Sequence, residues 1–288
     1  MTEFLKIMAI RSDGERMEYE SDEWGVLGVD GLDFSEIEVF REPRGFGHGD
    51  LITGRRKRSR DITIQAKLRK PQLYVPNRQR IIGFHNSNFT YDLYFTHLDT
   101  VRIAKDCVLN AASYGVVGRG STPVLNLMYT APDSDLFADN AEVTNFTLTT
   151  PLWHDTRVYT QGGGTLAFGE IKTTTTKEIE YLGSEPAPVK VKVEFTGYDD
   201  NLQFILGSRT VDVPGTFYDG EVIVIDTGTR TVKKGHRPYD ETQATSLDID
   251  PRLLYKMQME YGINTVEVKS KNHAFRSELW YIGRYNGI

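Results

Sequence analysis

The sequence predicts a mainly β protein made of two domains. Three observations support this prediction: apolar and polar residues alternate along many short segments, turn signals separate those segments, and the chain is long enough for two cores. The chain has 288 residues, of which 39% are hydrophobic and 11% aromatic. A chain of this length and composition can bury two cores of ordinary domain size.

Period-two alternation identifies the strands. In VKVKVEF (189–195), three valines and a phenylalanine fall on one face, and two lysines and a glutamate on the other. The same pattern predicts strands over 61–68, 90–96, 221–226, 264–270 and 277–285. Turn signals between strands lie at 12–14 (Ser-Asp-Gly), 213–215 (Val-Pro-Gly) and 218–220 (Tyr-Asp-Gly). Together these features predict antiparallel sheets.

Helix signals are few. PNRQRIIGFHN (76–86) begins with a proline and an asparagine, and its Ile81, Ile82 and Phe84 are spaced to cover one side of two turns. It predicts one short helix on a sheet. DPRLLYKMQMEYG (250–262) offers Asp250 as an N-cap and a glycine as a stop, although an irregular connection fits the same residues.

The domain boundary is predicted near residue 140. The strand pattern lapses over TAPDSDLFADNAE (130–142), a polar stretch with one proline and three aspartates. We therefore expect an N-terminal domain over 1–140 and a C-terminal domain over 141–288. No repeat of fixed period is present, which argues against a solenoid or propeller.

The charge distribution contains one local anomaly. The formal net charge is -6, which argues against a general nucleic-acid binder, because such proteins carry a domain-wide basic excess. Yet five cations stand within six positions: Arg55, Arg56, Lys57, Arg58 and Arg60. Nucleic acid, a membrane surface or an acidic face of another protein could accept this charge.

Catalytic and metal-binding patterns are weak. The six histidines show no metal-binding spacing, and Cys107, the single cysteine, excludes intrachain disulfides and cysteine-based zinc sites. The glycine-rich GFGHGD (45–50) lacks the partners of a phosphate loop, so we interpret it as a loop that needs positive φ angles. We expect neither a cofactor nor an enzyme, although a carboxylate pair, as in a glycosidase, is not excluded; Asp199 and Asp200 in GYDDN favour a turn.

Two further features concern location and sugars. The N-terminus lacks the pattern of a secretion signal, and no apolar run is long enough to span a membrane, so we expect no membrane insertion. Several aromatic residues of the second half, Trp153, Tyr159, Tyr181, Tyr198 and Trp280, are of the type that stacks on sugars. We expect most of them in a core or an interface.

The order of these elements resembles a known family. LGVDGLD (27–33), the glycine-rich loop at 45–49, the helix segment at 76–86 and APDS (131–134) are similar to the first domain of distal tail proteins of long-tailed, siphovirus-type bacteriophages. In the second half, GSEPAPVKVKVEFTG (183–197) and GEVIVIDTGTRTVKK (220–234) resemble that family's galectin-like β-sandwich. The resemblance covers nearly the whole chain and implies an N-terminal β-sandwich or barrel-like domain with one short helix, followed by a C-terminal galectin-like β-sandwich.

The resemblance also implies a function. Such proteins are structural subunits of the tail tip or baseplate, where a homo-hexamer joins the tail tube to the tail-tip hub and leaves a channel for DNA. The implied partners are the tail tube protein, the hub or lysin protein, and tape-measure and receptor-binding proteins, in a virion assembled in the host cytoplasm. We expect no specific nucleic-acid binding, and we expect the five cations to pair with carboxylates of an adjoining subunit, tube or hub protein. The alternative is a carbohydrate-binding adhesion module that contacts the host surface.

Overall fold

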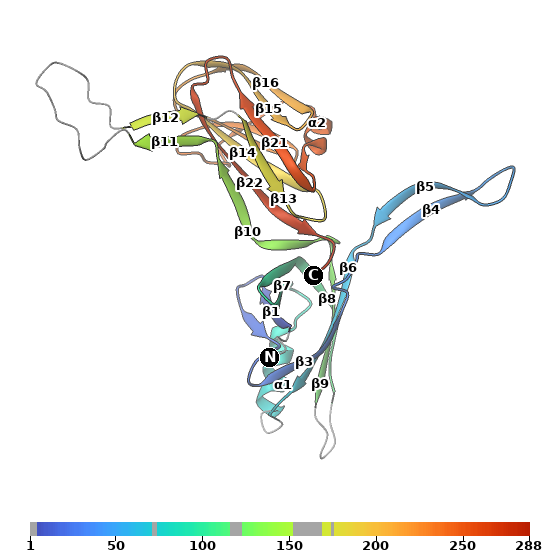
Figure 1. The fold of residues 1–288 in the computed structure, drawn as a ribbon. Helices are drawn as coiled ribbons and strands as arrows, with labels where there is room; N and C mark the ends of the chain where they lie inside the picture. The colour runs from blue at the N-terminus through green and yellow to red at the C-terminus, as the bar shows by residue number, and fades with distance from the viewer. Residues whose placement is uncertain (1–4, 71–73, 116–122, 152–168, 174–175) are drawn as a thin grey trace, which may run out of the picture. The chain divides into compact units, whose positions relative to one another are not determined.

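The computed structural model describes residues 5–70, 74–115, 123–151, 169–173 and 176–288. The chain forms two compact units, residues 1–139 with 284–288 and residues 140–283 (Figure 1). The last five residues thus belong to the first unit, whereas the sequence assigned them to the C-terminal domain. Trp153, His154 and Tyr159 lie outside the described residues.

The described residues of unit 1 form an antiparallel β structure with one helix. Its elements are β1 (Lys6–Arg11), β2 (Arg16–Glu18), β3 (Trp24–Asp30), β4 (Ile37–Pro43), β5 (Asp50–Lys57), β6 (Arg60–Leu68), α1 (Tyr74–Phe84), β7 (Thr90–His97), β8 (Thr100–Tyr114), β9 (Val124–Ala131) and the start of β10 (Leu136–Asn145). The first half of β8 pairs with β7, which pairs with β1, and β1 pairs with β2. The second half of β8 pairs with β9, and β6 lies between β9 and β3. Strand β8 therefore joins β7, β1 and β2 to β9, β6 and β3 within one sheet, with a register shift in each of these two pairings, around a shared core.

The core of unit 1 follows from the alternation in the sequence. Along β6 every second residue, including Ile62 and Ile64, is buried. Helix α1 adds Ile81 and Phe84 to this core. Ile82 was expected on the same side but is half exposed, because neighbouring residues of a helix point in different directions.

Unit 2 is a sandwich of two antiparallel sheets. Its elements are the rest of β10, β11 (Thr147–Pro151), β12 (Gly169–Thr173), β13 (Thr176–Tyr181), β14 (Ala187–Phe195), β15 (Asp199–Leu206), β16 (Arg209–Phe217), β17 (Glu221–Asp226), β18 (Thr231–His236), β19 (Thr245–Leu247), α2 (Pro251–Lys256), β20 (Gln258–Met259), β21 (Gly262–Lys269) and β22 (Phe275–Tyr285). One sheet of the sandwich has the order β13-β21-β15-β16, and the other contains β19-β18-β17-β14-β22, while β11 and β12 pair in a separate two-stranded sheet. Residues such as Val191, Phe204 and Ile225 fill the core of this unit. The predicted mainly β fold is confirmed.

The six predicted strands are present as β6, β7, β14, β17, β21 and β22. Strand β17 departs from the predicted half-burial, because Val222 and Val224 are buried as well as the core residues Ile223 and Ile225. This strand lies between β14 and β18, and it is covered on both faces.

Two local predictions were wrong. The helix predicted over 250–262 ends at Lys256, although Asp250 caps it by accepting from the backbone N–H of Arg252. The chain then extends because Met259 is buried and pairs with β14. Residues 213–215 do not form a turn: they lie within edge strand β16, where proline is tolerated because its missing N–H is not needed for pairing.

Among the described residues, no helix is both long and apolar enough to cross a membrane.

Candidate functional site

Strands β4 and β5 form a two-stranded sheet of their own, from the Ile37–Lys57 pair to the Pro43–Asp50 pair. Figure 1 shows this hairpin extending away from the other strands of unit 1. We call residues 36–58 the arm, and residues 44–49 its tip. The basic run of the sequence is therefore the returning strand of a projecting hairpin and the residues just after it.

The arm exposes apolar side chains. Ile37, Phe40, Leu51 and Ile52 are about half exposed, and Phe46 at the tip is 100% exposed. A two-stranded hairpin has no second layer to cover it and is marginally stable in water by itself. Clustered exposed apolar residues usually mark a contact surface.

The glycines at the tip serve backbone geometry. Gly47 and Gly49 have φ angles of 104° and 91°, which other residues rarely adopt. The expectation that GFGHGD is a loop with positive φ angles is confirmed. The tip connects two strands, so it lacks the strand-to-helix setting in which backbone amides converge on a phosphate.

The cations of the arm differ in their partners. Arg56 pairs with Glu38 (3.2 Å), and Arg58 pairs with Glu38 (3.3 Å) and Glu36 (3.6 Å). The hydrogen bond from Arg58 lowers the pKa of Glu38. Arg55 is exposed and has no ion-pair partner among the described residues. Exposed pairs of this kind contribute little to stability, so they can exchange partners at small cost.

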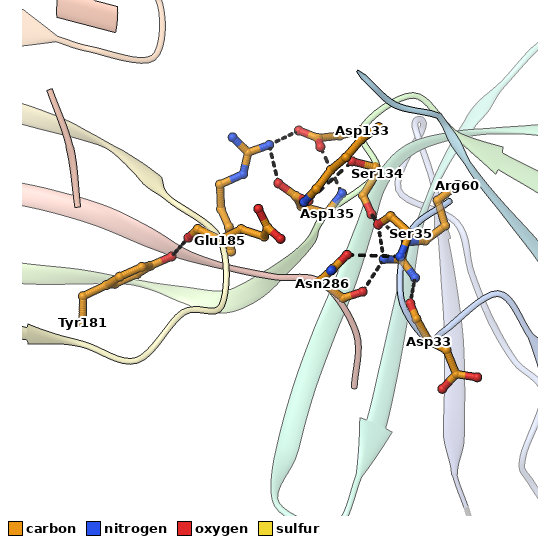
Figure 2. Close-up of polar contacts among 11 residues, drawn as sticks. Asp33, Ser35, Arg60, Asp133, Ser134, Asp135, Tyr181, Glu185 and Asn286 are labelled. Carbon is orange, nitrogen blue, oxygen red and sulfur yellow. Dashed lines mark hydrogen bonds and ion pairs between the residues drawn. The ribbon is translucent and has the colours of Figure 1, made fainter. Parts of the chain in front are cut away.

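The root of the arm is fixed by a partly buried ion pair and by Arg60. Lys57 binds Asp135 at 2.8 Å. Arg60 is only 4% exposed, and its five N–H groups donate to five acceptors at 2.7 to 2.9 Å. Figure 2 labels four of the residues that supply them, Asp33, Ser35, Ser134 and Asn286. The acceptors are the backbone oxygens of Gly31, Asp33, Ser134 and Asn286 and the hydroxyl of Ser35. Burial lowers the pKa of Arg60, and the nearby carboxylates, Asp135 foremost, oppose that shift.

The structure thus separates Arg60 from the four cations with which the sequence grouped it. Every N–H group of its guanidinium is already used within unit 1, so Arg60 cannot offer a donor to another molecule. It holds the root of the arm, while Arg55, Arg56 and Arg58 remain on the surface.

The C-terminus completes the root. Ser35 N donates to the Asn286 side chain at 3.1 Å, Ile288 N donates to Leu32 O at 3.2 Å, and Arg284 pairs with Asp133. Sequence reasoning missed this contribution.

In LGVDGLD (27–33), Gly31 is one residue that could have indicated the root of the arm from the sequence. Gly31 has a φ of 90°, and a Cβ at that position would lie 2.0 Å from the backbone oxygen of Asp61. Only glycine therefore fits where this turn meets β6. The requirement indicates a close backbone approach, but it does not identify Arg60 as the residue that uses the carbonyl of Gly31.

Two further side chains of reactive types, Cys107 and His85, are buried. Cys107 is buried in β8, and burial raises its pKa to about 12. Burial lowers the pKa of His85 to about 4, and its ring nitrogens contact Tyr19 Oη (2.7 Å) and Ile81 O (2.9 Å). Within the described part of the chain, no group of three or more His, Cys, Asp or Glu residues could hold a metal ion.

The predicted turn residues of GYDDN also have different surroundings. Asp199 and Asp200 begin β15 rather than lie in the turn itself, which precedes them. Asp199 is fully buried, whereas Asp200 pairs with Lys271.

Comparison with solved structures identifies proteins of similar fold. The fold is similar to that of the SPP1 Dit (gp 19.1) protein, described as a paradigm of the hub adsorption apparatus in phages that infect Gram-positive bacteria, with a TM-score of 0.65 and 13% identity over 96% of this chain and 98% of that one. The predicted resemblance to distal tail proteins is confirmed at the level of the fold. Two structures of the phage P2 baseplate, with calcium and with strontium, match at TM-scores of 0.46 and 0.45, with 9% and 10% identity over 99% of this chain and 100% of theirs. No family model and no curated protein matches the sequence.

Proposed function

We propose that this protein is a structural subunit of a phage tail tip, in which a homo-hexameric ring joins the tail tube to the tail-tip hub and leaves a channel for DNA. The fold shared with SPP1 Dit over nearly the whole of both chains supports the baseplate role. The observation that carries the proposal is the arm, an exposed apolar and basic hairpin on a buried root. The proposed location is the tail tip of a virion assembled in the host cytoplasm.

The arm is suited to contact a neighbouring subunit. Phe46 and the half-exposed aliphatic residues would leave water in such a contact, which stabilises association. Arg55 and two further exposed cations near the tip, Arg41 and Arg44, can then meet carboxylates in bidentate geometry. A chain of net charge -6 offers such carboxylates on its other surfaces.

Ring formation also needs the arm to keep a fixed direction. The five hydrogen bonds of Arg60, which we call the clamp, and the Lys57–Asp135 pair hold the root. Less conformational freedom is therefore lost when the arm docks. The proposed partners are further copies of this chain, the tail tube protein and the hub or lysin protein, with tape-measure and receptor-binding proteins as further neighbours.

Light scattering over a concentration series tests the proposal. Six chains of 32.7 kDa give 196.2 kDa (6 × 32.7), and the observed mass should rise toward this value with concentration. The double variant Phe46→Ser/Arg55→Ser should remain at low mass with an unchanged circular dichroism spectrum. Val75→Ser/Arg276→Ser, which also replaces one exposed apolar residue and one exposed cation, should assemble like the wild type. A wild-type chain that stays at 32.7 kDa, or an arm variant that assembles normally, contradicts the proposal.

A further inference from the structure

Three connections lie together at one end of the unit 2 sandwich. They are residues 196–198 between β14 and β15, 218–220 between β16 and β17, and 270–274 between β21 and β22. Thr196 N donates to Ala274 O at 2.9 Å, and Gly220 N donates to Phe195 O at 3.0 Å. These backbone hydrogen bonds join the three connections into one surface.

Two tyrosines project from this surface. Tyr198 is 52% exposed and Tyr218 is 56% exposed. Their ring centroids are 5.8 Å apart, with an angle of 61° between the ring planes. The two rings thus form an open corner, with apolar ring surface left in water.

A buried carboxylate orders the loop beside these rings. Asp199 is fully buried, and it accepts hydrogen bonds from Ser270 Oγ (2.5 Å), Asn272 N (2.9 Å) and Ala274 N (2.9 Å). Burial by itself would raise the pKa of Asp199, but these hydrogen bonds outweigh it and lower the pKa. The carboxylate of Asp199 therefore ties residues 270–274 to the start of β15, and such ordering favours a preorganised binding surface.

Polar groups surround the corner at fixed positions. Tyr198 Oη donates to Asp200 Oδ1 at 3.0 Å, Lys271 Nζ lies 3.5 Å from Asp200 Oδ2, and Asn272 Nδ2 donates to Tyr198 O at 3.2 Å. The lysine keeps further N–H groups, and the oxygens of the amide and the two phenols can still accept. Hydrogen-bond donors and acceptors thus lie beside two half-exposed aromatic rings.

We propose that Tyr198, Tyr218, Asp200, Lys271 and Asn272 form a binding site for a neutral hexopyranose unit of a polysaccharide. One face of a pyranose ring carries C–H groups that pack on an aromatic ring, while its neighbouring hydroxyls both donate and accept hydrogen bonds. Asp200 and Lys271 offset each other's charge, which suits a neutral sugar. A nucleic acid fits poorly, because its phosphates would lie near the carboxylates of Asp200 and the exposed Asp219.

This site lies in unit 2 and does not depend on the proposed ring. The arm is part of unit 1, so replacement of the tyrosines should leave the light-scattering result unchanged. Failure of sugar binding and failure of ring formation can therefore be distinguished in the same preparations.

Saturation-transfer NMR on the full chain tests the site. The probes are the methyl glycosides of glucose, galactose, mannose, N-acetylglucosamine and rhamnose, each titrated in turn. We expect saturation of the C–H face of at least one glycoside, with the affinity reduced about tenfold or more by Tyr198→Ala or Tyr218→Ala. Tyr218→Phe, which keeps the ring, should retain most of the binding.

Tyr261→Ala is the matched control, because Tyr261 is 76% exposed in the same unit but lies outside the three connections. It should bind like the wild type. The proposal is overturned if no glycoside receives saturation, if the two tyrosine variants bind as well as the wild type, or if those variants lose assembly instead, which would identify a protein contact.

Discussion

Replacement of Arg60 with methionine should strongly destabilise unit 1. Methionine keeps part of the side-chain volume but removes all five donors, so the oxygens of Gly31, Asp33, Ser134 and Asn286 and the Ser35 hydroxyl lose a partner. The Ser134 and Ser35 contacts are buried, whereas the other three are partly buried and can regain water. A hydrogen bond to a charged group contributes about 1.5–3 kcal/mol, so two buried losses amount to about 3–6 kcal/mol. Relief of the guanidinium's own desolvation removes the upper part of this range, which leaves about 3–5 kcal/mol.

The loss should be measurable as a shift in melting temperature. For a unit of this size, 1 kcal/mol corresponds to about 3 °C, which gives a decrease of about 10–15 °C. Calorimetry gives the transition, and hydrogen exchange assigns it, because amides of β6 should lose protection while those of β14 in unit 2 keep theirs. Arg55→Met is the control, since a surface substitution changes stability by only about 0.5 kcal/mol. A loss below about 1 kcal/mol for Arg60→Met, or equal losses for both variants, would refute the clamp.

Two other predictions follow from buried and paired groups. Burial holds the pKa of His85 at about 4, against 6.5 unperturbed, so the unfolded chain takes up this proton first as the pH falls. Stability should be full above about pH 7.5 and lower by about 2 kcal/mol at pH 5, and urea unfolding of His85→Gln should show a shallower decline; an identical decline would contradict this. Duplex DNA should bind weakly: Arg60 is buried, Lys57 pairs with Asp135, and Glu36 and Glu38 beside Arg56 and Arg58 would repel phosphates. In anisotropy titrations, the slope of log K against log salt concentration should be no steeper than about -1. A slope near about -4.5, as for five phosphate contacts, would show that the five cations bind DNA and would contradict this prediction.

The strands were predictable because their signal is local. In β14 every second residue is buried, as the alternation of valines and charged residues indicates. The end of the short α2 was not predictable, because Asp250 and a proline specify where a helix starts but not where β-pairing ends it. The pairing of Met259 with Ala187 joins residues far apart in the sequence, and no local pattern records it.

In the candidate sites, too, features with a local sequence signal were predictable and contacts between distant residues were not. The basic run and the glycine-rich tip predicted an exposed segment, and the arm carries both. The role of Arg60 was hidden because its acceptors lie up to 226 residues away, at Asn286. Likewise, GYDDN indicates a turn, but only the fold brings Ser270 and Asn272 to the buried Asp199.

The distinction between Arg55 and Arg60 decides how the basic run has to be tested. Replacing all of its arginines with serine would remove the exposed cations and the clamp together, so a loss of assembly would follow from a disordered root even if the arm made no contact. Arg55→Ser with Phe46→Ser leaves every hydrogen bond of Arg60 in place and changes only surface that is free to meet a neighbour. If that variant keeps the β6 amides protected and fails to assemble, the arm itself makes the contact. If it assembles while Arg60→Met does not, unit 1 needs its root for stability, and the contact lies on another surface.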